Sequence, residues 1–212
     1  QSDYYNLLGQ VKADLAKKGD NAAFEGAVEA YKKAIAIEEA AGKSWNTDEV
    51  QQRLAALSAD LVNSAVDDNS AQNFDAAADK LYMSYKINPQ DTIYLYFAAS
   101  SAVNGGNYER ALDYYKELKD LGYDGSSVIY KATNVETGEV EAMDKTQRDL
   151  MVKSGTYTDP IDEKQPSKKA EIVKNVALIY TQLGKNEEAL AAFSDARADN
   201  PDDVNLVLNE AN

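Results

Sequence analysis

One short pattern recurs along the chain, an alanine followed four residues later by a leucine or an aromatic residue. It occurs at Ala77, Ala111 and Ala189, and more weakly at Ala27, where KKGDN lengthens the preceding turn. Ala77 and Ala111 are 34 residues apart, whereas the flanking pairs are 50 and 78 apart, so 16 and 44 residues exceed one repeat. An internal repeat of this period predicts stacked helical hairpins, here with two insertions.

The last hairpin shows why the pattern fits two packed helices. Ala177 and Ala189 are small enough to let two helices approach closely. Gly184 permits a tight turn between the helices, and Pro201 ends the second helix.

These spacings resemble the tetratricopeptide repeat, whose pattern is W-x₂-L-G-x₂-Y, followed by A-x₃-F and then by P. In this chain Val173 stands in place of the Trp, and Val176-Ala177 stand in place of Leu-Gly. The matching positions are Val173, Val176, Ala177, Tyr180, Gly184, Ala189, Phe193, Ala196 and Pro201. The resemblance implies an all-α, right-handed α-solenoid of helical hairpins. The departure at Asp68, which stands where the pattern has Tyr, has no explanation in the sequence.

The repeat register divides the chain. The predicted segments are a divergent first hairpin (1–41), a helical insertion that extends the next helix (42–57), three repeats (58–91, 92–125, 170–203), a second insertion (126–169) and the start of a further repeat (204–212). In the first insertion, Thr47 or Asp48 is expected to cap a helix, with Trp45 tucked beneath it.

The second insertion differs in kind from the repeats. SSVIYKATNVETGEVEAM alternates β-branched and aromatic residues around Thr137-Gly138, which predicts a small β-hairpin between Ser126 and Met143. A short helix is expected from the capping Asp144 to Gly155. TYTDPIDEKQPS is predicted to be a loop interrupted by proline. Because an isolated two-stranded hairpin is marginal in water, we expect it to pack on the helical stack.

The composition restricts the chemistry. The chain has no His and no Cys, so thiolate nucleophiles and the usual zinc ligands are missing, and we expect no enzyme activity, metal or cofactor. The formal net charge of −14 disfavours nucleic acid as a partner. No apolar run is long enough to insert into a membrane. The acidic runs Asp159 to Glu163 and Asp199 to Asp203 lack the ligand pattern of a calcium loop.

The family resemblance implies a concave groove lined by the first helix of each repeat. The expected groove residues are Val62, Val66, Asn69, Ile93, Tyr96, Ser100, Val103, Asn104, Lys174, Leu178, Thr181 and Gln182. These side chains are mostly small, apolar or amide, which suits an extended peptide or a partner helix, with Tyr96 as the central aromatic. The open alternative is that the long insertion or a neighbouring molecule fills the groove. A carboxylate clamp for chaperones is not expected, because Leu178 stands where the clamp has Asn.

The leading hypothesis is a non-catalytic scaffold that binds a peptide or partner protein of unknown identity in this groove. The alternative is an accessory carbohydrate-binding or hydrolytic envelope protein that uses the acidic clusters and the insertion. Apolar residues between Val204 and Leu208 suggest self-association through the last helix. The chain is also similar to bacterial envelope repeat proteins in which Gln follows a cleaved signal peptide. The expected location is therefore the periplasm or the outer membrane, with the cytoplasm as the alternative.

Overall fold

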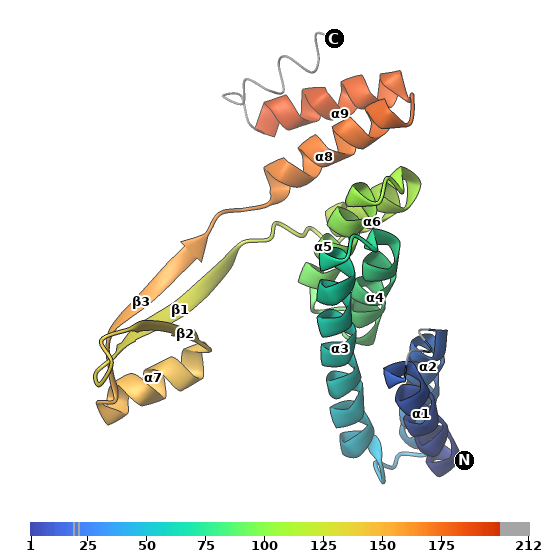
Figure 1. Cartoon of the computed structure of the whole chain (residues 1–212), viewed down its shortest axis with the longest axis vertical. Coiled ribbons are helices and arrows are strands. Elements are labelled where there is room, and N and C mark those ends of the chain that lie inside the picture. Colours follow the sequence, from blue (N-terminus) through green and yellow to red (C-terminus); the bar gives the residue numbers. More distant parts are fainter. Residues whose placement is uncertain (19, 21, 200–212) are drawn as a thin grey trace. The chain divides into compact units, whose positions relative to one another are not determined.

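The structure is a computed structural model that describes residues 1–18, 20 and 22–199 (Figure 1). It divides into two compact units, Gln1–Asp120 and Leu121–Asn212. None of the helices in the described part combines the length and the apolar character that crossing a membrane requires.

The first unit consists of helical hairpins. Its helices are α1 (Ser2–Lys17), α2 (Ala22–Ala40), α3 (Thr47–Ser70), α4 (Phe74–Ile87), α5 (Thr92–Asn104) and α6 (Tyr108–Asp120). Helices α1 and α2, α3 and α4, and α5 and α6 pack as pairs, and α4 also packs on α5. Helix α3 has 24 residues, which accommodates the first insertion as extra helix.

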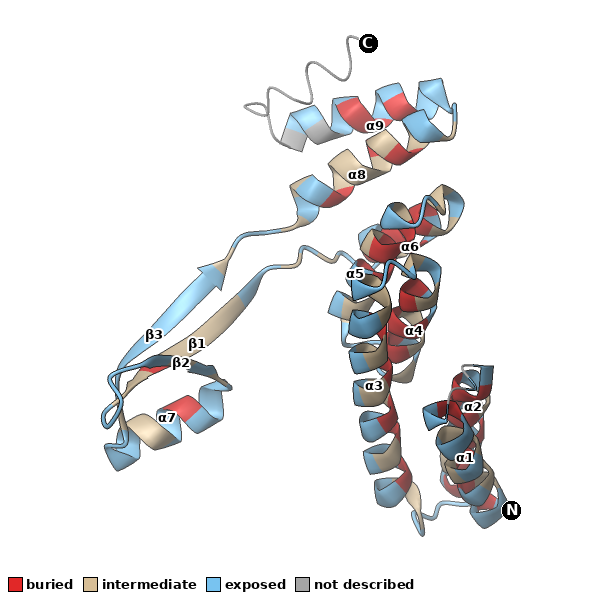
Figure 2. Cartoon of the chain, viewed as in Figure 1, coloured by how far each residue is buried: buried red, intermediate tan, exposed pale blue. Residues whose placement is uncertain are grey.

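Alanines are buried between the paired helices. Ala27, Ala77 and Ala111 are all 0% exposed, and Figure 2 shows the buried residues on the sides of the helices that face each other. The short side chain lets two helix backbones approach, and larger residues such as Tyr115 fill the remaining space. The predicted all-α fold of helical hairpins is confirmed.

The carboxylate of Glu38 organises the connection between α2 and α3. It is 1% exposed and accepts hydrogen bonds from the Asn46 backbone N–H (2.9 Å) and from Thr47 Oγ1 (2.8 Å). Burial raises the pKa of Glu38, but these hydrogen bonds outweigh burial and lower it to about 2. Because the turn is built around this carboxylate, Trp45 is left 70% exposed, and the expectation that it tucks beneath the helix is wrong. The N-cap of α3 is Asn46, not Thr47 or Asp48.

The second unit begins with the insertion. Its elements are β1 (Ser127–Asn134), β2 (Val140–Met143), α7 (Lys145–Ser154) and β3 (Tyr157–Gln165). The strands form an antiparallel sheet in the order β2-β1-β3, and α7 packs against β1 and β3. The predicted β-hairpin and the helix after Asp144 are both present, and Asp144 Oδ1 caps α7 by accepting from the Gln147 N–H at 2.9 Å. This module thus supplies its own third strand and helix as packing partners for the hairpin.

The predicted loop within TYTDPIDEKQPS is wrong, because most of that segment is the strand β3. Lys131 pairs with Ile161 and Thr133 with Thr158, so Asp159 and Pro160 together lie opposite a single residue of β1. This β-bulge interrupts the ladder where proline has no N–H to donate, and Asp159 adopts a positive φ of 47°. Since β3 is an edge strand, proline is tolerated there.

The last hairpin pairs α8 (Lys169–Gln182) with α9 (Asn186–Asp199). Ala177 and Phe193 are 0% and 3% exposed, and Gly184 has a φ of 68° in the turn between the helices. Pro201 and the predicted partial repeat 204–212, with its proposed role in self-association, lie outside the described residues. The stacking of this hairpin on the first unit stays a prediction.

Candidate partner-binding groove

A hollow with a cavity volume of about 450 Å³ is lined by residues of α3, α4 and α5. It is lined by Val62, Val66, Asn69, Phe74, Leu81, Tyr94, Phe97, Ser100, Ser101 and Asn104. Of these described lining residues none carries a charge. We call this surface the α3/α5 groove.

The sequence of α5 explains why aromatic rings face this groove. The alanines Ala98, Ala99 and Ala102 are each 0% exposed and occupy the side of α5 that packs in the hairpin core. Tyr94 and Phe97 are three residues apart and therefore share one side of the helix, adjacent to the alanine side. Phe97 remains 45% exposed, so packing within the chain leaves part of its ring accessible.

The α3 side of the groove is apolar with polar groups at one end. Val66 is 57% exposed, and Asn69 lies one turn further along the same helix. Ser101 Oγ donates to Asn69 Oδ1 at 3.0 Å, which ties α5 to α3 at this point. Asn69, Ser100 and Asn104 place amide and hydroxyl groups beside the apolar surface. These amide and hydroxyl groups can form hydrogen bonds with the backbone N–H and C=O groups of a bound peptide.

The structure brings five of the predicted groove residues together. Val62, Val66, Asn69, Ser100 and Asn104 all line the α3/α5 groove. Binding by them stays a prediction, but their common location agrees with the register carried over from the repeat family.

Three other predicted residues of α5 lie outside the lining. Ile93 is 39% exposed and Val103 is half-buried. Tyr96 is 6% exposed and packs beside Phe97, with their ring centroids 5.7 Å apart. Tyr96, the predicted central aromatic, is therefore largely buried, and because one residue turns a helix by about 100° the exposed ring of α5 belongs to Phe97.

The remaining predicted residues, Lys174, Leu178, Thr181 and Gln182, lie on α8 in the second unit. Leu178 packs partly against the core of the last hairpin, and Thr181 Oγ1 donates to the Ala177 carbonyl at 3.1 Å. Gln182 is exposed. Whether these residues bind a partner stays a prediction.

Sequence reasoning missed the apolar half of the groove. The predicted groove residues do not include Phe74, Leu81, Tyr94 or Phe97, although the three-residue spacing of Tyr94 and Phe97 is a usable signal.

The structure also explains the unusual aspartate of the second repeat. Asp68 Oδ2 lies 2.6 Å from Nζ of Lys80, whose side chain is 8% exposed, and the same Nζ donates to Ser64 Oγ at 2.8 Å. Asp68 therefore replaces an aromatic residue because it neutralises a buried lysine of α4.

Two residues of the acidic run on β3 form ion pairs with other elements of the insertion. Asp162 pairs with Arg148 of α7, and Glu163 pairs with Lys131 of β1. Within residues 1–18, 20 and 22–199, no group of three acidic side chains is arranged to hold a metal ion. The other acidic run, up to Asp203, falls largely outside the described residues.

Comparison with known proteins gives remote structural likenesses only. No family model and no curated protein matches the sequence. A tetratricopeptide repeat protein from Parabacteroides merdae aligns over 98% of this chain and 71% of its own, with 14% identity and a TM-score of 0.42. A structure of MamA aligns over 92% and 78%, with 14% identity and a TM-score of 0.41. A structure of MamA AMB-1 aligns over 98% and 96%, with 17% identity and a TM-score of 0.41.

Similarity at this level leaves the function to be argued from the residues of this chain. Its 34-residue spacing between Ala77 and Ala111, together with its paired helices, makes the chain tetratricopeptide-like in fold.

Proposed function

We propose that the protein is a non-catalytic scaffold that binds an apolar segment of a partner protein in the α3/α5 groove. The observation that supports this best is a hollow of about 450 Å³ with an uncharged lining, in which Val66 and Phe97 are about half exposed. Concave apolar surface with a few polar groups is typical of a binding site.

The groove chemistry suggests how a segment binds. A large apolar side chain enters between Phe97 and Val66, and the amides of Asn69 and Asn104 bind the segment's backbone. Because the chain has a formal net charge of −14, flanking basic residues on the partner segment would speed association.

The residue inventory supports a role without catalysis, since the sequence contains no His and no Cys. The carbohydrate-binding or hydrolytic alternative depends on acidic side chains of the insertion. It is less favoured because Asp162 and Glu163 are engaged in ion pairs. Location in the periplasm or at the outer membrane also remains our proposal, supported by the resemblance to envelope repeat proteins and testable by fractionating the source cells.

A peptide-display library selected on the purified protein tests the binding proposal. We expect the enriched peptides to share one or two large apolar residues with basic neighbours. Phe97→Ser should weaken the best peptide roughly 30-fold, the effect of losing a central anchor worth about 2 kcal/mol. Thermal unfolding should change little, because the Phe97 ring is 45% exposed.

Leu150→Ser is the matched control, since Leu150 is a 65% exposed apolar residue on α7. It should leave peptide affinity unchanged. Full affinity in Phe97→Ser together with lost affinity in Leu150→Ser would place the binding surface on the insertion and refute the groove.

A further inference from the structure

The first helix carries its large apolar side chains on the outside. Tyr4, Leu7, Val11 and Leu15 are 63%, 60%, 50% and 45% exposed. Their spacing of three and four residues places all of them along one side of α1. We call this row the α1 stripe.

The opposite side of α1 is small or polar and is the side that packs on α2. Ser2, Asn6, Gly9 and Ala16 are its buried residues. A Cβ atom at Gly9 would lie 2.5 Å from the ring of Tyr31, so only glycine fits there. Helix α1 cannot turn to bury its stripe, because a leucine or tyrosine in place of Gly9 would collide with Tyr31.

We propose that the α1 stripe pairs with the same stripe of a second copy of this chain, with the two helices antiparallel. The two ends of the stripe lie symmetrically about its midpoint, so in an antiparallel pair Tyr4 lies opposite Leu15 of the second copy. Leu7 then lies within about one residue, roughly 1.5 Å along the helix, of the level of Val11 of the second copy.

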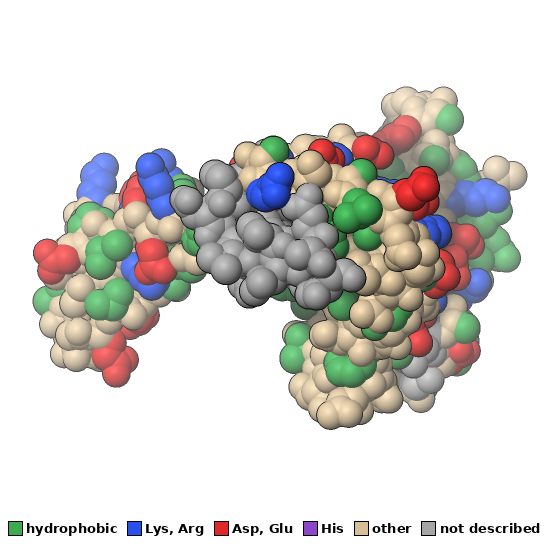
Figure 3. Space-filling view, turned by 90° about the horizontal axis from the view of Figure 1, so that it is seen from above, with side chains coloured by type: hydrophobic (Ala, Val, Ile, Leu, Met, Phe, Trp, Pro, Cys, Tyr) green, Lys and Arg blue, Asp and Glu red, His purple; other side chains and the backbone are tan. Residues whose placement is uncertain are grey.

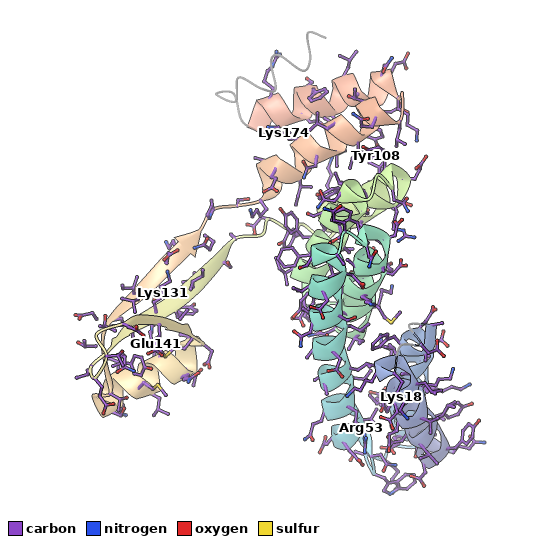
Figure 4. The ribbon with its side chains drawn as sticks, viewed as in Figure 1. Lys18, Arg53, Tyr108, Lys131, Glu141 and Lys174 are labelled. Atoms are coloured by element: carbon purple, nitrogen blue, oxygen red, sulfur yellow. The ribbon has the colours of Figure 1, made fainter. Side chains whose placement is uncertain are left out.

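The charges at the two ends of α1 favour this orientation. Asp3 lies in the first turn of the helix. Lys18, which is labelled in Figure 4, directly follows the end of the helix. An antiparallel pair brings Asp3 of one copy towards Lys18 of the other, whereas a parallel pair places like charges together. An anionic membrane surface is a poorer occupant, because the chain has a net charge of −14.

The expected dimer is weak. Four exposed side chains on one helix cover less than the roughly 800 Å² per partner of a standard stable interface. We therefore expect a dissociation constant of about 10 μM, so that the dimer forms in concentrated solutions.

Engineered cysteines test the pairing, since the natural sequence has none. In the antiparallel pair the two copies of residue 11 are offset by only about 5 Å along the helices, and the two copies of residue 15 by about 16 Å. Val11→Cys should therefore form disulfide-linked dimers on mild oxidation, whereas Leu15→Cys alone should not. A mixture of Tyr4→Cys and Leu15→Cys should give the mixed dimer.

Sedimentation equilibrium at about 100 μM supplies the second readout, a concentration chosen to exceed the expected dissociation constant. Leu7→Glu with Val11→Glu should make the chain monomeric with unchanged circular dichroism, whereas the control Leu150→Glu should still dimerise. Equal cross-linking at positions 11 and 15 would overturn the antiparallel arrangement. A wild-type chain that stays monomeric and does not cross-link at position 11 would overturn the pairing altogether, leaving the stripe to another partner.

Discussion

The helical hairpins and the inserted sheet are stabilised by different interactions. In the hairpins, alanines such as Ala77 and Ala111 are fully buried between helices, with leucines and tyrosines packed around them. In the insertion, the buried side chains between residues 126 and 165 are those of Ala132 and Arg148. Figure 3 shows acidic and basic side chains together on this module, at the left of the view. Close apolar packing stabilises the first region, and charged groups carry more of the stability of the second.

Arg148 is the centre of the insertion. It pairs with Asp149 (2.8 Å) and with Asp162, and its guanidinium lies 5.0 Å from the ring centroid of Tyr130. One side chain thus connects α7 to both β1 and β3. A module with so little buried apolar surface is expected to open more readily than the helices.

The largest effect is expected from a charge buried among the helices, where apolar packing otherwise dominates. Asp68→Ala removes the partner of Lys80, which is 8% exposed, and should lower the free energy of unfolding by about 3 kcal/mol. Urea denaturation measures this change. Adding Lys80→Met should recover much of the loss, because the unpaired charge is then gone. No loss in the single variant would show that the pair is unimportant.

Arg148→Ala should cost about 2 kcal/mol, but only locally, since it removes a cation–π contact and two ion pairs. Hydrogen exchange should accelerate in β1 and β3 and stay unchanged in α3 to α6. Faster exchange throughout the helical unit would contradict the separate stabilisation of the two regions.

A pH-dependent effect is expected at Glu38, whose pKa is lowered to about 2 by its hydrogen bonds. A carboxylate with a depressed folded-state pKa contributes stability above its ordinary value, near 4.3, and loses it as the pH falls towards 2. Glu38→Gln should therefore lower the thermal midpoint at pH 7 and reduce the difference from wild type near pH 2. A constant difference over this range would refute the role of the charge.

The smallest effect is expected for the ion pair of Lys131 and Glu163, whose side chains are 29% and 44% exposed. Lys131→Ala should change stability by less than about 1 kcal/mol, because solvent screens exposed pairs. Thermal unfolding of this variant is also a control for Arg148→Ala. An equal loss of stability in Lys131→Ala and Arg148→Ala would show that the burial of Arg148 adds nothing to the stability of the insertion.

The sequence predicted the elements better than it predicted side-chain directions. The four-residue spacing of alanine and a larger apolar residue indicated the helices of the hairpins, and Asp144 and Gly155 indicated the two ends of α7. Both patterns depend only on residues close together in the sequence. Strand β3 was missed because Pro160 was interpreted as a breaker, and the bulge that accommodates it depends on pairing with a distant strand. The groove was predicted in part, but the choice between Tyr96 and Phe97 depends on a rotation of α5 that only packing fixes.

Hydrogen exchange of the protein with its best display-selected peptide tests the central claim most directly, because it compares both regions in one measurement. Binding in the α3/α5 groove should slow exchange in the second half of α3, from Val62 to Asn69, and in α5, while β1 to β3 stay unchanged. Protection confined to residues 127–165 would contradict the claim and assign recognition to the inserted sheet.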